Sequence, residues 1–341
     1  MNIAVKSLIT LTMGYAKYGH YFNDGLNNTG TLEILDIGFA SLTNSDYNIN
    51  QIIDKDLKSK IKLHSNLSHK YSKGKVGIYA GSKGMTGAAI LSAKSAERIG
   101  SGIIKLITPS SLNAIYEEKL INIITVPISD GNKGFLSIDK QNDIQSFIEW
   151  ADALCCGPGL SVDDESQKLI ATILQEFNKP LVLDASGFEP IINGKLKISD
   201  LPKKTIMSPH YKEFSRIFNI DLKIVIADPI ACCKKVVSIL NGRVLILKGP
   251  TTIIVSSTGS LFIMTNGKPI LATAGTGDVL SGILVGLLVQ QYSIDDCAII
   301  ATYLHAEVGN DFVYNISDIG MLASDMIDFL PSTLQRIMDV D

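Results

Sequence analysis

The sequence lacks the spacing patterns that would assign a metal or redox chemistry. Its cysteines stand at Cys155, Cys156, Cys232, Cys233 and Cys297, four of them in adjacent pairs inside apolar runs, and no CxxC pair occurs. Adjacent cysteines rarely bridge each other or share a zinc ion, so we expect buried thiols in a reducing compartment. No His/Cys/Asp cluster has the spacing of a tight metal site. The sequence therefore predicts no protein-ligated metal.

An excess of basic residues is also absent. The chain has 31 lysines and arginines against 34 aspartates and glutamates, for a formal net charge of −3. Nucleic acid is therefore not an expected partner, although backbone N–H groups can still bind a nucleotide phosphate. No apolar run reaches the roughly 20 residues of a membrane span, so no membrane partner is expected. Ser7–Ala16 resembles a signal peptide only weakly, and a cytoplasmic protein is the expectation.

Several well-known catalytic loops are missing as well. The chain has no Walker A loop, no GxGxxG fingerprint and no Gly-x-Ser-x-Gly elbow. The hydrophobic content of 46% and charged content of 19% are those of a globular protein with a large core. A chain of 341 residues holds one large α/β domain or two ordinary ones.

Apolar strand-like segments alternate with helix-like segments from Gly74 onward. Strands are predicted at Val76–Ala80, Ile103–Ile107, Ile123–Val126, Ala153–Cys156, Pro180–Asp184, Thr205–Met207 and Val244–Lys248, with a hairpin over Thr251–Ser256 and Ser260–Thr265. Helices are predicted at Gly87–Ile99, Glu165–Phe177, Asp228–Leu240, Asp295–Tyr314 and Ser317–Ile337. This alternation predicts an α/β fold with a mostly parallel central sheet covered by helices on both faces. Ligands of such sheets bind at the carboxyl ends of the strands.

The amino-terminal part of the chain has a different composition. Residues 1–40 hold short apolar pieces, and residues 41–72 are rich in Asn, Ser and Lys, which is typical of a linker. One helical turn is conceivable around Ile52–Leu57. We therefore expect the large domain to occupy residues 73–341.

The run Ala272–Gly282 carries the strongest functional signal. Gly275 and Gly277 allow a sharp turn, and an apolar helix follows from Val279. The N-terminus of a helix attracts phosphate through its free N–H groups and positive partial charge. Asp278 beside such an anion site is expected to act as a base on a hydroxyl during phosphoryl chemistry. The alternative is that Asp278 is only the N-cap of the helix.

Other loops at predicted strand ends have two interpretations each. Gly81–Ala89 and Gly157–Ser161 either approach a ligand with bare backbone or serve as tight packing and turns. His210 and Glu213 share a helix face, where they either contact a ligand or form a capping pattern. Lys248–Thr252 suits nucleotide phosphates, or is a hairpin entry. His305, among apolar residues, is expected to be a packed core histidine.

Taken in order, these loops resemble those of one family, the ADP/ATP-dependent NAD(P)H-hydrate dehydratases, which have a ribokinase-like fold. The resemblance covers about residues 73–337 and rests on eight motifs. They are Lys73-Gly74, Gly81–Ala89, Gly157–Leu160, Leu183–Ala185, Pro209–Phe214, Leu247–Gly249, Ala272–Gly282 and Tyr303–His305. Two details depart from the family pattern: Asp184–Phe188 reads Asp-Ala-Ser-Gly-Phe, and no Pro-Glu pair precedes Gly131. These departures concern the substrate pocket rather than the nucleotide loop.

The resemblance implies a repair reaction in which hydrated NADH or NADPH (NADHX or NADPHX) loses water at the expense of ADP or ATP. It implies Asp278 as catalytic base and contacts from Ala88, Gly159, His210 and Asp278 to the hydrate. Residues implied for the nucleotide are Lys248, Gly249, Pro250, Thr251, Thr252, Gly275, Thr276 and Gly277. A Mg²⁺ ion is expected on the phosphates with few protein ligands. Apolar residues within 1–40 favour a homo-oligomer.

A second resemblance covers residues 8–38, which are similar to the tail of the NAD(P)H-hydrate epimerase domain. Its Asn-Asn-Gly-Gly-Asp-Gly loop and its catalytic and potassium-binding residues are absent. The sequence thus predicts the dehydratase half of a bifunctional protein with a truncated, inactive epimerase remnant, or else an incomplete gene model. Two further alternatives are a vitamin-precursor kinase of the same fold and an inactive nucleotide-binding remnant. The presence of Asp278, Gly277 and Lys248 argues against an inactive remnant.

Overall fold

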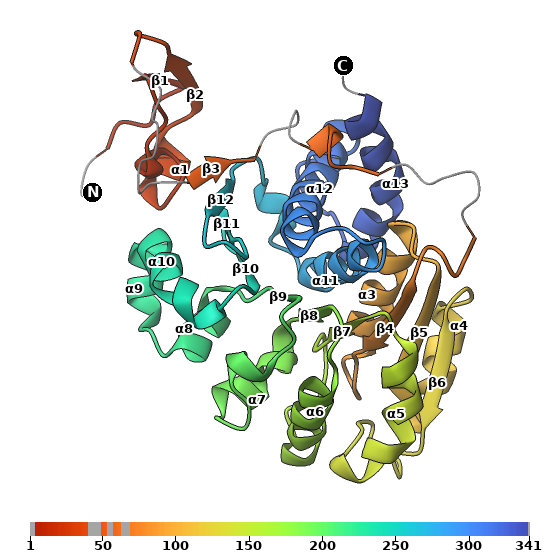
Figure 1. The fold of residues 1–341 in the computed structure, drawn as a ribbon. Coiled ribbons are helices and arrows are strands. Elements are labelled where there is room, and N and C mark those ends of the chain that lie inside the picture. The colour runs from red at the N-terminus through yellow and green to blue at the C-terminus, as the bar shows by residue number, and fades with distance from the viewer. Residues whose placement is uncertain (1–3, 40–48, 53–56, 63–68, 340–341) are drawn as a thin grey trace.

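The main sheet of the protein runs through the whole molecule (Figure 1). The computed structural model describes residues 4–39, 49–52, 57–62 and 69–339. Within these residues ten strands form one sheet in the order β3-β12-β11-β10-β9-β8-β7-β4-β5-β6. Every strand of this sheet except β11 runs in the same direction. The strands are β3 (Ile49–Gln51), β4 (Lys75–Tyr79), β5 (Ile103–Pro109), β6 (Ile124–Ile128), β7 (Ala153–Cys156), β8 (Leu181–Leu183), β9 (Thr205–Met207), β10 (Val244–Leu247), β11 (Thr252–Val255) and β12 (Leu261–Met264).

Helices cover both faces of this sheet, as the alternating pattern predicted. Side chains on one face form a core with α3 (Thr86–Arg98), α4 (Asn113–Lys119), α11 (Thr276–Leu288), α12 (Ile294–Asn315) and α13 (Ala323–Asp339). Those on the other face pack against α5 (Gln141–Trp150), α6 (Asp164–Glu176), α7 (Glu189–Ile192), α8 (Tyr211–Phe218), α9 (Leu222–Ala227) and α10 (Pro229–Leu240). Short 3₁₀ turns occupy Tyr18–His20, Ser110–Leu112, Ile138–Lys140, Ala185–Phe188, Ile198–Asp200 and Pro269–Leu271. Strands buried on both faces explain the continuous apolar runs of the sequence.

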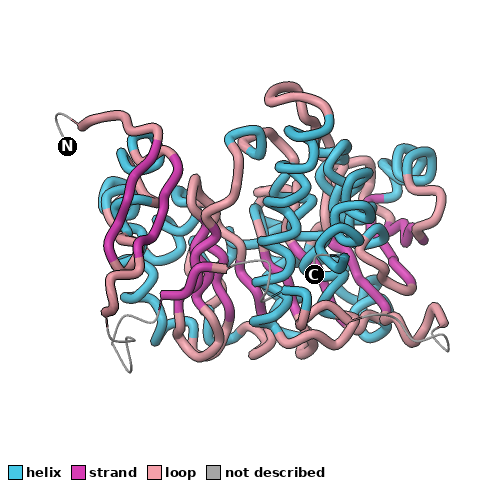
Figure 2. The backbone as a smooth tube through the Cα atoms, turned by 90° about the horizontal axis from the view of Figure 1, so that it is seen from above, coloured by secondary structure: helices cyan, strands magenta, loops and turns pink. Residues whose placement is uncertain are grey.

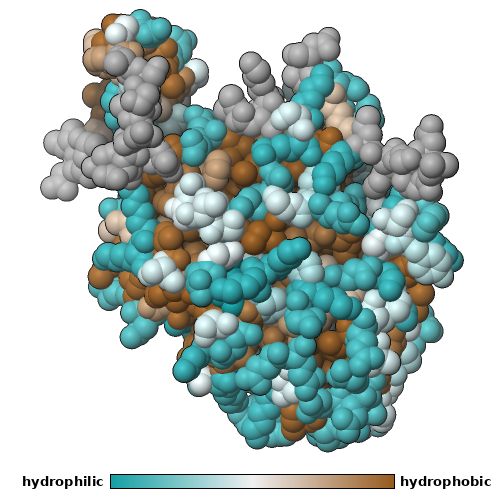
Figure 3. Space-filling model, in the orientation of Figure 1, coloured by the Kyte–Doolittle hydropathy of each residue, from teal (hydrophilic) through white to brown (hydrophobic). Residues whose placement is uncertain are grey.

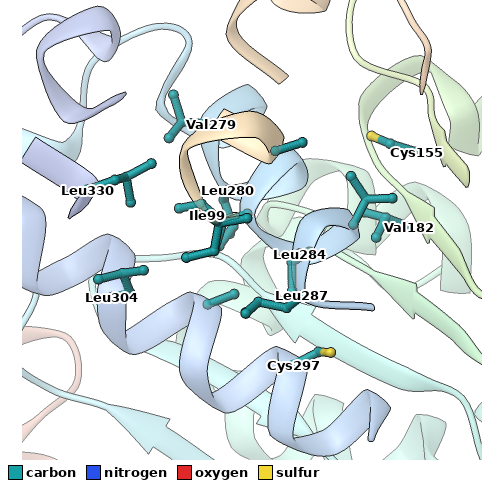
Figure 4. Packing of buried hydrophobic residues seen from close by; sticks show 14 of the residues in the cluster. Ile99, Cys155, Val182, Val279, Leu280, Leu284, Leu287, Cys297, Leu304 and Leu330 are labelled. Carbon is teal, nitrogen blue, oxygen red and sulfur yellow. The ribbon is translucent and has the colours of Figure 1, made fainter. Parts of the chain in front are cut away.

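Helix α11 lies at the centre of one of these layers. Eleven of its residues are buried, and its leucines lie between Leu304 and Leu330 on one side and Val182 of the sheet on the other (Figure 4). Gly282 brings it close to α3, because a Cβ there would stand 1.9 Å from the Ser95 Oγ. This packing holds the amino end of α11 at the carboxyl edge of the sheet.

The amino-terminal residues form a small two-stranded sheet of their own. Strands β1 (Ile9–Met13) and β2 (Thr31–Leu35) pair in parallel, and α1 (Asp24–Asn28) lies in the connection between them. Figure 2 shows the two strands apart from the main sheet. The predicted linker also contains a strand that its composition did not indicate, since β3 joins the main sheet in parallel beside β12. Among the described residues, no helix is both long and apolar enough to cross a bilayer.

Two predicted elements need correction. The last helix begins at Ala323 rather than Ser317, because Gly320 adopts a φ of 92° that a helix does not accommodate. The apolar segment that starts at Ile123 becomes a strand only from Ile124, and Leu120 closes the preceding helix α4 instead. The helical turn predicted around Ile52–Leu57 lies mostly outside the described residues.

Candidate active site

The amino end of α11 forms the turn that the sequence predicted. Gly275 is the N-cap, with a φ of 93° that favours glycine, and the helix begins at Thr276. Asp278 lies in the first turn, so the interpretation of Asp278 as the N-cap is wrong. The first N–H groups of a helix have no intrahelical acceptor. The Thr276 N–H donates to the Thr273 carbonyl at 3.4 Å, so the N–H groups that follow it in the first turn are the ones available to an anion, with the Asp278 carboxylate in the same turn.

An ion pair stands directly beneath this turn. Lys248, just after β10, donates from its Nζ to the Asp184 Oδ1 at 2.7 Å. The other carboxylate oxygen of Asp184 accepts from the Ser281 Oγ at 2.7 Å, and Asp184 is 2% exposed. A Cβ on Gly277 would lie 3.4 Å from the Lys248 Nζ and 4.0 Å from the Asp184 Oδ2. The ends of β8 and β10 thus meet the glycine turn, and the ammonium group lies next to the anion site.

Burial and like charge perturb the carboxylates around this lysine. Burial, with the negative charge of Asp184 as the second cause, raises the pKa of Asp278 to about 6, while Lys248 opposes the shift. Burial also raises the pKa of Glu213, with Asp184 again the second cause. A carboxylate with a pKa of about 6 is mostly ionised at neutral pH, yet is a stronger base than an exposed aspartate. Asp278 therefore has the protonation behaviour of a general base.

His210 and Glu213 form the capping pattern that was one of their two interpretations. His210 is the N-cap of α8, and its Nδ1 accepts from the backbone N–H of Lys212 and of Glu213, each at 3.2 Å. The Glu213 Oε2 accepts from the His210 N–H at 2.9 Å. The His210 Nε2 lies 3.5 Å from the Glu213 Oε1, and the His210 side chain is still 52% exposed, so the face of the ring can be reached by a ligand. The backbone of His210 forms an isolated parallel β-bridge with that of Lys248, which places His210 beside the ion pair.

The two glycine loops predicted for the substrate are fastened to each other. The Gly81 N–H donates to the Pro158 carbonyl at 2.8 Å, and the Ser82 Oγ to the Gly159 carbonyl at 2.8 Å. Gly159 has a φ of 64°, and a Cβ there would stand 2.8 Å from the Ala88 Cβ. Tight packing therefore holds together the two residues implied for the hydrate, Ala88 and Gly159.

Helix α3 connects these loops with the glycine turn. Ala88 lies in its first turn, and Ser92, one turn later, donates from its Oγ to the Asp278 carbonyl at 3.0 Å. A second brace comes from α12, where the His305 Nε2 lies 2.9 Å from the Thr276 carbonyl. Burial lowers the pKa of His305 to about 4, so the ring is neutral at pH 7 and its Nε2 donates the bond. His305 is thus a packed histidine, as predicted, that supports the turn from behind.

The loop after β10 is shaped by contacts to other segments. Gly249 lies against the Tyr211 ring, because a Cβ there would be 2.6 Å from a ring carbon. The Thr251 Oγ donates to the Tyr21 carbonyl, and Thr251 is 1% exposed. The Lys248 ammonium points instead toward the glycine turn. Within the described parts of the chain, no three His, Cys, Asp or Glu side chains gather in a way that could hold a metal ion.

The structure also identifies members of the site that the sequence analysis did not assign. Asp184 was noted as the end of a predicted strand and as part of the Leu183–Ala185 motif, and Ser281 as part of the Ala272–Gly282 run, but neither was assigned to the site. Asp184 could have been found, because it follows a buried strand at the carboxyl edge, where its neighbours carry the predicted site. The contact of Ser281 with Asp184 gave no signal in the sequence, since it spans 97 residues.

A mostly parallel sheet with an aspartate in a glycine turn at a helix N-terminus is an arrangement suited to binding a phosphate group. The chain matches the family described as NAD(P)H-hydrate dehydratase over residues 76–332. It therefore belongs to the NAD(P)H-hydrate dehydratase family.

Individual relatives agree with this assignment. The chain is 28% identical over 335 residues to the bifunctional NAD(P)H-hydrate repair enzyme of Moorella thermoacetica, and 29% identical over 343 residues to that of Dictyoglomus turgidum. These matches cover 98% and 99% of the chain but only 63% and 66% of the two relatives. The chain thus spans less than two thirds of the length of these curated relatives.

Solved structures have the same fold. A ribokinase-like protein of Enterococcus faecalis superposes with a TM-score of 0.75 at 24% identity, covering 88% of this chain and 99% of that one. The ADP/ATP-dependent NAD(P)H-hydrate dehydratase of Bacillus subtilis, co-crystallised with ATP and Mg²⁺, superposes with a TM-score of 0.74 at 25% identity. That match covers 85% of this chain and 99% of the Bacillus chain. The predicted ribokinase-like fold is confirmed.

Proposed function

We propose that this chain restores NADH and NADPH from their hydrates, NADHX and NADPHX, at the expense of ADP or ATP. The observation that carries the proposal is the Asp278 carboxylate, with its raised pKa, in the first turn of α11 beside Lys248. Membership of the dehydratase family supports this choice of substrate. The reaction makes the enzyme a lyase.

The chemistry begins at the hydroxyl group of the hydrate. Asp278 accepts the hydroxyl proton while the oxygen attacks the terminal phosphorus of ATP, and ADP leaves. The C–O bond of the resulting phosphate ester then breaks and inorganic phosphate departs. A proton lost from the neighbouring ring carbon restores the double bond. The sum is hydrate plus ATP giving reduced cofactor, ADP, phosphate and a proton; with ADP as donor, AMP is formed.

Each part of the site has a role in this scheme. The free N–H groups at the Gly275–Gly277 turn and the Lys248 ammonium neutralise charge on the transferring phosphoryl group. Lys248–Thr252 hold the nucleotide. Ala88, Gly159, the exposed His210 side chain and Asp278 contact the hydrate.

Magnesium is the ion that this arrangement fits. Mg²⁺ usually keeps several waters and binds through phosphate oxygens with one or two carboxylates at most. The site offers a cationic lysine and a helix N-terminus for phosphate rather than a cage of protein ligands, so the ion would be carried by the nucleotide. When bound there, it would neutralise phosphate charge during transfer.

The proposal is tested by incubating the protein with NADH hydrate, Mg²⁺ and either ATP or ADP while following the absorbance of the reduced nicotinamide. Absorbance should return with the nucleotide and not without it. The same fold serves in small-alcohol kinases, so a thiamine precursor is offered in parallel. Phosphorylation of that precursor with no regain of nicotinamide absorbance would overturn the proposal.

The amino-terminal unit supports a second part of the proposal, self-association of the chain in the cytoplasm. Several large apolar side chains of this unit are exposed, among them Leu8, Ile9, Leu11, Met13 and Phe39, and apolar surface shows on the unit in Figure 3. A patch of this kind is typical of an interface. Light scattering after size exclusion should give a multiple of 36.9 kDa, and a monomer mass would refute this part.

A further inference from the structure

The connection between β1 and β2, residues 17–28, lies against the proposed nucleotide loop. We call it the connector; it is outside the residues that match the dehydratase family, 76–332. Its Tyr21 carbonyl accepts from the Thr251 hydroxyl, and its Phe22 side chain is buried in the same core cluster as Ile230 and Ile253. Residues far apart in sequence are thus joined at the loop that follows β10.

Further contacts hold the connector in place on either side of this hydrogen bond. The Asn23 Nδ2 donates to the Ala227 carbonyl, at the end of α9, at 3.1 Å. The Tyr21 hydroxyl donates to the Gln51 Oε1 at 3.3 Å, and the Gln51 Nε2 in turn donates to the Thr265 Oγ at 2.7 Å. Gln51 belongs to β3, which pairs with β12 of the main sheet. The connector is therefore attached both to the helical layer and to the edge of the sheet.

These contacts restrict the nucleotide loop. Thr251 is 1% exposed, and without the connector its hydroxyl would lack the acceptor that it has here. A cavity of 460 Å³ lies between the connector and the start of α10. Beside this cavity, the buried Phe22 ring and the hydrogen bond of the Asn23 side chain hold the connector in place. A loop held in its binding conformation before the ligand arrives loses less entropy on binding.

We propose that the connector is a positioning element of the nucleotide site, which holds Lys248–Thr252 in the conformation that receives ADP or ATP. This inference rests on the proposed nucleotide site. It adds that residues of the β1–β2 unit contribute to nucleotide affinity without touching the nucleotide. The anchors are Phe22 and Asn23, and the adjacent Tyr21 carbonyl is the contact with Thr251 of the loop.

The test changes the anchors and leaves the loop intact. Asn23→Gly removes the bond to Ala227 and accepts the φ of 51° found at this position, and Phe22→Ala removes the buried ring. Each should raise the dissociation constant of ATP, measured by calorimetry, by about three- to tenfold, the effect of ordering one or two more side chains on binding. The KM of the hydrate should change by less than about twofold.

The matched control is Asn28→Gly in the same segment. Among the described residues, the Asn28 side chain bonds within its own helix, to the Asp24 carbonyl at 2.8 Å, so ATP affinity should not change. Unaltered ATP affinity in both Asn23→Gly and Phe22→Ala, with the fold intact by circular dichroism, overturns the inference. Because calorimetry needs no turnover, a wild-type protein that binds ATP but does not repair the hydrate would instead refute only the proposed reaction.

A double-mutant cycle separates positioning from direct contact. Thr251→Val removes the hydroxyl at nearly constant volume, and Thr251→Ser should restore wild-type affinity. If Thr251 acts through the connector, adding Asn23→Gly to Thr251→Val should weaken ATP binding no further than the larger single effect. Fully additive losses would mean that Thr251 and the connector act independently, and would overturn the inference.

Discussion

Replacing Asp278 by asparagine is the sharpest test of the proposed chemistry. Asparagine keeps the size of the side chain but cannot accept a proton from the hydroxyl group. Loss of a positioned general base lowers turnover by about 100-fold or more, which corresponds to about 2.7 kcal/mol of transition-state stabilisation. We therefore expect kcat of Asp278→Asn to fall by at least that factor in the nicotinamide absorbance assay.

Nucleotide binding should survive the same substitution. The glycine turn and Lys248 are unchanged, and the variant loses a negative charge near the bound phosphates. The dissociation constant of ATP should therefore stay the same or decrease. The control is Asp143→Asn, an exposed aspartate on α5 at the other face of the sheet, which should have full activity. Normal turnover in Asp278→Asn would show that the carboxylate is structural and that the mechanism is wrong.

The pH dependence follows from the same group. The pKa of Asp278 is raised to about 6, and only the ionised form can accept a proton. About nine tenths of the carboxylates are then ionised at pH 7 and about one tenth at pH 5. kcat/KM should fall about tenfold between those values, and the fall should be absent from the residual activity of Asp278→Asn. A wild-type profile that is flat down to pH 5 would contradict this assignment.

The remaining predictions concern stability. Lys248→Met leaves Asp184, which is 2% exposed, without its cation. The free energy of unfolding should fall by about 3 kcal/mol, the lower end for a broken buried ion pair, because the lysine is partly exposed. An unchanged midpoint of urea unfolding would contradict this prediction. Gly282→Ala places a Cβ 2.1 Å from the Ser92 carbonyl oxygen between α11 and α3, and should lower stability by about 2–3 kcal/mol in thermal unfolding. Gly267→Ala, whose Cβ would meet nothing closer than 3.7 Å, is the control and should be nearly neutral.

The main strands and several long helices could be predicted from local patterns. Val244–Leu247, for example, is a short apolar run between turn signals, and both faces of a central parallel strand are buried. Helices α4 and α5 were not predicted. Their apolar residues are few, and packing against the sheet stabilises them more than their own sequence does. Strand β3 was missed because three residues in a polar segment become a strand only when β12 offers them hydrogen bonds.

In the candidate site too, some residues could be predicted from local sequence, while their contacts could not. Asp278, the glycine turn and Lys248 were predicted as site residues because each follows a strand or opens a helix, and the structure brings them together at one edge of the parallel sheet. The partnership of Asp184 with Lys248 and Ser281 was not predictable, since it depends on which strand ends become neighbours. The truncated epimerase remnant stays a prediction. In the structure, β1 and β2 form a small parallel pair.

The sequence alone determined the α/β class, the family motifs and the residue types that can hold phosphate and move a proton. These properties are local, because they depend on apolar periodicity and on short loops with fixed spacing. Only the tertiary structure decided that Asp278 is a first-turn carboxylate with a raised pKa rather than a cap, since burial and the charge of Asp184 produce that shift. It also decided that the connector covers Thr251, a contact across 230 residues that no local pattern encodes.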